Sequence, residues 1–219
     1  MAICVALLGG ESSGKSTLAK ALQRHLTENH GLHAVCVPEH LRAWCEARGR
    51  APHADEQAAI ADEQTRLIQR ARQTPGVDIV IADTTALMVA AYSALYFQDT
   101  ALLAPSLAAQ RSCELTLLMG LDLPWTPDGL FRDSPAVRDA TDELLRRELQ
   151  GAGIAFQTVY GQGNARLQQA LRAVGTALGR PLVKDDPALA NGLRPWSCDN
   201  CSDPDCEHRL FTGLLSRNA

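Results

Sequence analysis

Residues Gly9–Ser16 read GGESSGKS and decide the fold of this chain, because they contain the complete phosphate-binding pattern G-x-x-x-x-G-K-S. The apolar run Ile3–Leu8 precedes them and has the character of a buried strand. After them, apolar residues recur at helical spacing, at Leu18, Ala21, Leu22 and Leu26. A glycine-rich turn that matches by accident is the alternative, but the flanking strand and helix favour a true phosphate loop.

The loop chemistry predicts that a nucleoside triphosphate and Mg²⁺ bind here. Gly9 and Gly14 permit backbone conformations that let successive amide N–H groups turn toward a phosphate chain. Lys15 is expected to reach the β- and γ-phosphates, and the Ser16 hydroxyl to ligate Mg²⁺. The positive end of the following helix adds to the attraction. The residues expected to contact ATP are Gly10, Glu11, Ser12, Ser13, Gly14, Lys15, Ser16 and Thr17.

Length and charge limit the classes of protein that this chain can belong to. A chain of 219 residues suits one α/β domain plus an appendage. The net charge of −4, with both signs scattered, gives no footprint for nucleic acid. The apolar runs are strand-sized, far short of the ~20 residues that cross a bilayer. Since the first of them leads straight into the phosphate loop, without a secretion signal, we expect a cytoplasmic protein with no membrane partner.

Strand-like runs alternate with helical patterns as far as Gly179. The further strands expected are His33–Val37, Val77–Ala82, Leu115–Leu121 and Ile154–Tyr160. The further helices expected are Asp55–Thr74, Ala86–Leu95, a segment from Asp99 or Thr100 to Arg111, Pro135–Gly151 and Asn164–Leu178. Such alternation predicts an α/β fold of the P-loop NTPase type, with a five-stranded, mainly parallel sheet flanked by helices. We therefore divide the chain into a domain of residues 1–179 and a Cys-rich C-terminal extension of residues 180–219.

Two carboxylates follow predicted strands. Asp83 comes at the end of an apolar strand that should lie beside the phosphate loop, where it can hold Mg²⁺. The alternative is that Asp83, Thr84 or Thr85 caps the next helix. Glu39 follows the second strand, where it can accept a proton from a substrate hydroxyl. Its alternative is a solvated loop residue.

Four more side chains are candidate substrate contacts. Arg42 lies three residues after Glu39 and can anchor the same substrate or pair with that acid. Gln64 carries both an amide donor and an acceptor, which suit the edge of a base or a carboxamide; a plain surface role is the alternative. Trp125 and Asp128 belong to a predicted loop that contains proline and glycine, where Trp125 stacks on a ring or simply covers the core.

The same loop predicts a closing arginine. Arg132, or Arg138 further along, can stabilise charge on a transferring phosphoryl group when the loop closes over ATP. The sequence does not choose between them. With Lys15, Glu39 and Asp83, these two arginines complete the set of candidate catalytic residues.

Taken together, these motifs resemble the ribosylnicotinamide kinase domain of NadR-type proteins. The resemblance covers about Ala2 to Leu178 and is carried by the following elements in order: Leu8–Thr17, Glu39–Arg42, Gln64, Ala82–Thr84 and Pro124–Gly129. It implies a P-loop kinase fold like that of nucleoside and nucleotide kinases. It also implies ATP- and Mg²⁺-dependent phosphorylation of the 5'-hydroxyl of nicotinamide riboside or a related nucleoside, with Glu39 or Asp83 as the base. The arginine that the family often has after Leu130 is displaced here by Phe131, so the identity of the closing arginine stays open.

A cluster of soft ligands lies near the C-terminus. Its members are Cys198, Cys201, Cys206 and His208, which form a set that tetrahedral Zn²⁺ takes in structural sites. Free thiols in an acidic tail, or a redox pair, are the alternatives. The tail can dock on the main domain, bind a partner or order a homodimer.

Two functions are therefore compared. The first is an ATP-dependent small-molecule kinase that acts on a nucleoside. The second is a regulatory ATP-binding or ATPase module that signals to a partner through a zinc-stabilised tail. The loop sequence from Trp125 to Arg132 favours the kinase, because a switch has little need of an aromatic, acidic and glycine-containing lid.

Overall fold

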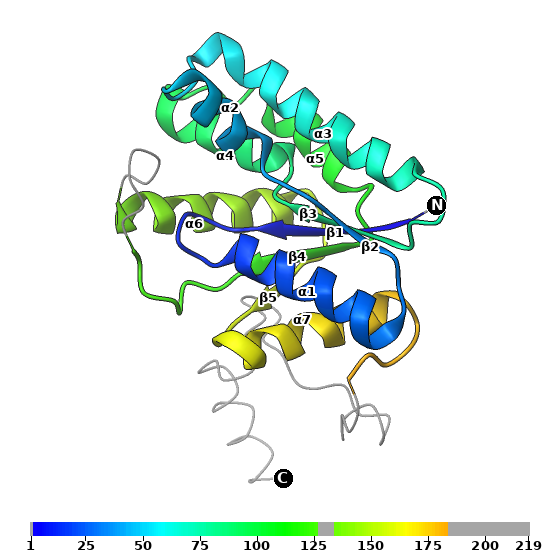
Figure 1. Cartoon of the computed structure of the whole chain (residues 1–219). Helices are drawn as coiled ribbons and strands as arrows, with labels where there is room; N and C mark the ends of the chain where they lie inside the picture. The colour runs from blue at the N-terminus through cyan, green and yellow to red at the C-terminus, as the bar shows by residue number, and fades with distance from the viewer. Residues whose placement is uncertain (1, 127–133, 184–219) are drawn as a thin grey trace, which may run out of the picture.

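Five parallel strands form one sheet within residues 2–126 and 134–183, the part of the chain that the computed structural model describes. Their order across the sheet is β2-β3-β1-β4-β5 (Figure 1). Their bounds are β1 Ile3–Leu8, β2 Ala34–Val37, β3 Ile79–Asp83, β4 Leu115–Met119 and β5 Gln157–Val159. Every pairing between neighbours is parallel. The predicted five-stranded α/β fold is therefore confirmed.

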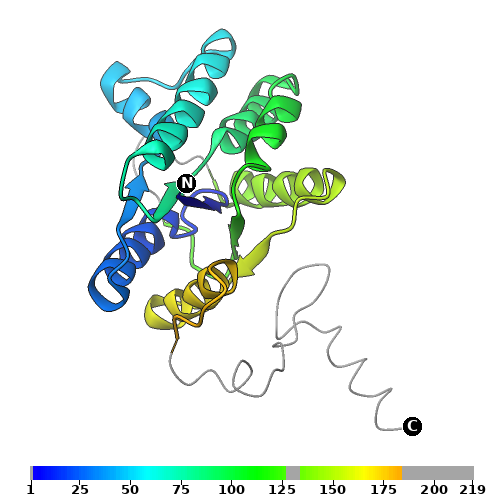
Figure 2. The same ribbon diagram turned by 90° about the vertical axis from the view of Figure 1, so that its right-hand side faces the viewer.

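Helices cover both faces of the sheet, as a parallel sheet requires. In Figure 2, α1 and α7 lie on one face, while α3, α4, α5 and α6 lie on the other. The helices span α1 Lys15–His30, α2 His40–Arg48, α3 Gln57–Gln73, α4 Ala86–Phe97, α5 Leu103–Gln110, α6 Pro135–Gly151 and α7 Gly163–Ala177, with a short 3₁₀ turn, η1, at Ala54–Glu56. Within the described residues, none of these helices is long and apolar enough to cross a membrane.

The alternation of side chains along β1 explains why its sequence is apolar throughout. Val5 and Leu7 pack in the core cluster beneath α1 and α7. Cys4 and Leu8 point the other way, into the clusters beneath α3 and beneath α4 to α6. Because both faces are covered, no position of the strand can be polar without burying an unpaired group.

Strand register brings the two predicted carboxylates to one edge of the sheet. Leu7 of β1 lies opposite Asp83 of β3, and Val37 of β2 lies opposite Ala82. The phosphate loop begins directly after β1, and Glu39 is the second residue after β2. Parallel strands end at a common edge, so the loop, Asp83 and Glu39 are neighbours although the chain separates them widely.

Several predicted elements are longer than the observed ones. The strand expected to reach Leu121 ends at Met119, and the last strand contains only Gln157–Val159. That strand lies at the sheet edge, so only the three residues opposite Leu117–Met119 have ladder partners. The helix expected from Asp99 or Thr100 begins at Leu103, because Asp99 caps a turn by accepting a hydrogen bond from the Ala101 amide at 2.9 Å.

Other boundaries match the sequence closely. Ser134 caps α6 by accepting a hydrogen bond from the Val137 amide at 3.3 Å, and Pro135 occupies the first helical position as predicted. Residues 184–219 lie outside the described residues. The proposed division after residue 179 therefore stays a prediction.

Candidate active site

The phosphate loop connects β1 to α1 and is built from backbone conformations that few residues adopt. Gly14 caps α1 with φ of 81°, in the left-handed region that favours glycine. A Cβ atom at Gly10 would lie 2.8 Å from Arg138 Cγ and 2.9 Å from the Arg138 carbonyl oxygen. The Ser13 hydroxyl donates to the Gly10 carbonyl at 2.7 Å and closes the turn. Hydrogen bonding within the loop and the close packing of Arg138 against Gly10 thus hold its shape.

Lys15 sits at the centre of the loop. Its ammonium donates to the Gly9 carbonyl at 2.6 Å and to the Gly10 carbonyl at 2.9 Å. Burial lowers the pKa of Lys15, while Glu39, Asp83 and Glu11 act against that shift. The loop therefore holds a cation beside three acids, in the position where a phosphate chain would meet it.

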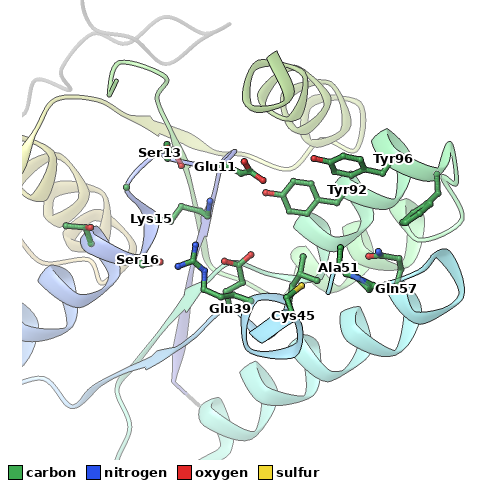
Figure 3. Close-up of a pocket in the computed structure, with 17 residues that line it drawn as sticks. Glu11, Ser13, Lys15, Ser16, Glu39, Cys45, Ala51, Gln57, Tyr92 and Tyr96 are labelled. Atoms are coloured by element: carbon green, nitrogen blue, oxygen red, sulfur yellow. The ribbon is translucent and has the colours of Figure 1, made fainter. Parts of the chain in front are cut away.

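One cavity of about 570 Å³ opens from the loop (Figure 3). We call its first part the loop end, which is formed by Glu11–Thr17. We call its second part the aromatic end; its lining residues are Leu41, Cys45, Ala51, Pro52, Gln57, Tyr92, Tyr96 and Phe97. Glu39 and Arg42 line the cavity too, and Figure 3 shows Glu39 between Lys15 and the aromatic end. The two ends share one continuous space.

Asp83 is buried at the end of β3, with 6 % of its surface exposed. Its Oδ1 atom has no hydrogen-bond partner among the described residues. An orphaned, buried carboxylate oxygen is costly unless something outside the protein satisfies it. Carboxylate and hydroxyl oxygens are ligands that Mg²⁺ prefers, and the Ser16 hydroxyl lines the cavity. The chemistry of these two side chains therefore suits that ion, and their role in holding it stays a prediction.

Glu39 occupies the position before α2, with an extended backbone. Burial is the main cause of the raised pKa of Tyr92, and Glu39 adds to that rise, whereas at Lys15 Glu39 opposes the lowering of the pKa by burial. Arg42 acts in the opposite direction on both groups, so the two side chains face the same space. The structure brings Glu39 and Arg42 together at the cavity, and their predicted roles remain to be tested.

Gln64 lies behind the cavity rather than in its lining. The side chain is 1 % exposed, and its Oε1 atom accepts a hydrogen bond from the His40 amide at 2.7 Å. Its Nε2 atom donates to the carbonyls of Pro38 and Thr84 at 3.3 and 3.4 Å. Gln64 thus ties the ends of β2 and β3 to the start of α2, a structural task that its sequence position did not reveal.

The predicted lid is only partly within the described residues. Asp128 and Arg132 lie outside them. Trp125 is half-buried, and neither it nor Arg138 is among the described residues that line the cavity. The Arg138 guanidinium donates to the Leu123 carbonyl at 2.8 Å, so this arginine packs behind Gly10 and supports the loop in the present conformation.

Sequence reasoning missed two groups of residues. Arg166 of α7 is 4 % exposed and donates to the Ser13 carbonyl at 2.6 Å and to Asp122 Oδ1 at 2.6 Å, so it braces the phosphate loop. The aromatic end was missed as well, because its tyrosines lie on α4, a helix whose apolar pattern gives no sign of a cavity. In both cases the functional contact joins segments far apart in the chain.

The four predicted zinc ligands, Cys198, Cys201, Cys206 and His208, lie outside the described residues. Within residues 2–126 and 134–183, no group of three or more His, Cys, Asp or Glu side chains is arranged to hold a metal. The zinc site therefore stays a prediction.

Comparison with known proteins supports the observed fold. A family model described as an AAA domain matches residues 4–166. Among solved structures, a NadR protein in complex with NR superimposes with a TM-score of 0.67 at 24 % identity, over 84 % of this chain and 54 % of that one. A NadR protein in complex with NAD and AMP-PNP gives 0.64 at 23 % identity, over 84 % and 51 %.

A nucleotide kinase shares the same architecture. Thymidylate kinase from Ehrlichia chaffeensis gives a TM-score of 0.57 at 14 % identity, over 79 % of this chain and 98 % of that one. No curated protein matches the chain. The chain spans about half the length of the two NadR structures, so the likeness concerns one part of those proteins. At these identities the comparison establishes the P-loop kinase fold.

Proposed function

This chain belongs to the AAA domain family, and we propose that it is an ATP-dependent kinase of a small nucleoside. The reaction would transfer the γ-phosphoryl group of ATP to the 5'-hydroxyl of nicotinamide riboside or a related nucleoside. One observation carries the proposal: the phosphate loop and an aromatic end open into a single cavity, with a carboxylate between them. Such a space suits a donor and an acceptor that must meet in line.

Different side chains of the cavity would bind the phosphates, accept the hydroxyl proton and hold the metal. The loop amides and Lys15 would hold the β- and γ-phosphates of ATP. As the acceptor oxygen forms its bond to the γ-phosphorus, the bond from that phosphorus to the ADP oxygen breaks. The hydroxyl proton passes to Glu39, which lines the cavity, whereas Asp83 lies outside its lining. This placement favours Glu39 as the base and leaves Asp83 for the metal.

Mg²⁺ would be held by Ser16 and by the orphaned oxygen of Asp83. When bound, it would neutralise charge on the β- and γ-phosphates. Lys15 would supply a positive charge that is already oriented, because two loop carbonyls hold its ammonium in place.

The aromatic end suits a flat, positively charged ring such as a pyridinium. Tyr92 and Tyr96 lie with ring centroids 6.2 Å apart, and Tyr96 is 46 % exposed although it is a large aromatic residue. Aromatic faces attract cations, and the nearby carboxylates of Glu11 and Glu39 add negative potential. The solved NadR protein in complex with NR makes nicotinamide riboside the first acceptor to test.

A panel experiment tests the proposal. The full chain is incubated with ATP, Mg²⁺ and, separately, nicotinamide riboside and the common purine and pyrimidine nucleosides. Mass spectrometry should detect a phosphorylated nucleoside together with ADP, most rapidly from the pyridinium riboside. ATP binding without phosphorylation of any nucleoside would contradict the kinase and favour the regulatory module.

A further inference from the structure

The aromatic end contains one buried polar group without a partner. Gln57 is 3 % exposed, and its Oε1 atom has no hydrogen-bond partner among the described residues. The same side chain lines the cavity. Figure 3 places it at the end remote from Lys15, beyond Glu39 and beside Ala51. An unpaired amide oxygen in such a place loses free energy unless a ligand satisfies it.

The position of Gln57 is fixed by its surroundings. It is the first residue of α3, and the segment before it is tied back by Glu56. The Glu56 carboxylate accepts hydrogen bonds from Arg50 Nη1 and Nη2 at 2.7 and 2.8 Å and from the His53 amide at 2.7 Å. The Arg50 guanidinium also lies 5.0 Å from the centre of the Trp44 ring. This bracing keeps Gln57 at one place in the cavity wall, as a recognition group requires.

We infer that Gln57 is a specificity residue whose amide oxygen accepts a hydrogen bond from an N–H group on the ring of the phosphoryl acceptor. The inference rests on the proposed function and deepens it, because it names the chemistry of the acceptor. The ring lies along Tyr92 and Tyr96, with its sugar hydroxyl directed toward Glu39 and the loop end. An exocyclic carboxamide supplies the N–H donor, whereas an unsubstituted ring supplies none.

The experiment compares two acceptors that differ only in that group: nicotinamide riboside and the riboside of unsubstituted pyridine. The wild-type chain should show kcat/KM about tenfold or more higher for the carboxamide, because the unsubstituted ring leaves Gln57 unpaired. Gln57→Met keeps the length of the side chain but removes its hydrogen bonds. This variant should bring the ratio of kcat/KM values close to one, mainly by raising KM for the carboxamide.

Two further variants make the result specific. Gln73→Met is the matched control, because it makes the same change at the exposed far end of α3, and it should leave the ratio unchanged. Gln57→Glu keeps an acceptor oxygen and should retain the preference for the carboxamide. Thermal unfolding identifies a variant that fails to fold, and Gln57→Leu then replaces Gln57→Met.

Each outcome has a definite meaning. A ratio that Gln57→Met leaves at the wild-type value, with phosphorylation of both ribosides, overturns the role of Gln57 and leaves the kinase standing. Absence of phosphorylation of any nucleoside by the wild-type chain overturns the kinase and this inference with it.

Discussion

The loop end and the aromatic end of the cavity are built in opposite ways. The loop end consists of contiguous residues, Glu11–Thr17, whose shape is set by hydrogen bonds among near neighbours such as Ser13 and Gly10. The aromatic end combines two separate parts of the chain: residues of α2 and of the segment that leads into α3, and residues of α4, which follow more than thirty positions later. The shape of a contiguous loop depends mainly on its own residue types, whereas the shape of a surface assembled from several elements depends on how those elements pack.

Under the proposed function, the loop end would serve phosphoryl transfer and the aromatic end would select the acceptor. The polar groups of the loop end would bind any nucleoside triphosphate, because the phosphate chain presents the same charged oxygens whatever nucleoside carries it. Under the proposed function, the few polar groups set in the apolar wall of the aromatic end would decide which ring fits. We therefore expect changes at the loop end to alter the rate for all acceptors, and changes at the aromatic end to alter the ranking of acceptors.

Replacement of Lys15 tests the loop end most severely. Lys15→Met removes the cation that two loop carbonyls hold in place. The loss of one preorganised charge at a transferring phosphoryl group should lower kcat by about 10²–10³-fold for every acceptor. Steady-state kinetics with two nucleosides checks this. Lys20→Met, an exposed change on the same helix, is the control. A loss of activity confined to one acceptor would contradict the expectation that changes at the loop end affect all acceptors alike.

Asp83→Asn tests whether the orphaned oxygen serves a metal. The change keeps the shape of the side chain but removes its charge. Activity at limiting Mg²⁺ should fall by about 10–100-fold and recover in part at high Mg²⁺. A titration of activity against Mg²⁺ measures this, with Asp62→Asn on the exposed side of α3 as the matched control. An unchanged Mg²⁺ requirement would remove Asp83 from the metal site.

Gln64→Met sharpens the comparison, because Gln64 and Gln57 lie on the same helix but have different surroundings. Loss of the Gln64 amide leaves the partly buried His40 N–H without this partner and should destabilise the fold by about 1–3 kcal/mol. Denaturant unfolding measures that change. The preference between carboxamide and unsubstituted ribosides should survive in this variant, whereas it should vanish in Gln57→Met. A lost preference in both variants would mean that Gln64 also acts on the acceptor.

The smallest expected effect concerns Glu56 and pH. The hydrogen bonds from Arg50, followed by that from the His53 amide, lower the pKa of Glu56 from 4.5 to about 2. A carboxylate with a lowered pKa stabilises the fold above 4.5 and loses that contribution as the pH falls toward 2. Thermal unfolding should show a small advantage of the wild type over Glu56→Gln at pH 6 that disappears near pH 2. A constant difference would show that Glu56 acts by packing alone.

Much of the fold was predictable because its signals are local. The loop pattern, the apolar strands and the Ser134-Pro135 helix start each depend on a few adjacent residues. The location of Glu39 and Asp83 at one edge of the sheet was predictable too, since the carboxyl ends of parallel strands share that edge. The β5 strand was predicted too long, because its length depends on the reach of its neighbour β4.

The roles of the two glutamines of α3 were not predictable. They are seven residues apart, nearly two full turns, so they lie on the same side of the helix but about 10 Å apart along its axis. Gln57 at the helix start meets the cavity, whereas Gln64 meets the ends of β2 and β3. The different surroundings of the two glutamines are determined by where α3 packs along the sheet, which is a feature of the tertiary structure.

The sequence by itself determined the phosphate loop, the α/β order of elements and the edge at which the acids gather, because each follows from residue types at short range. The tertiary structure decided which side chains form the aromatic end, which arginine of α7 braces the loop and which glutamine of α3 lines the cavity. Those outcomes depend on how helices far apart in the chain pack against one sheet, and packing at that range is fixed by the sum of many weak contacts.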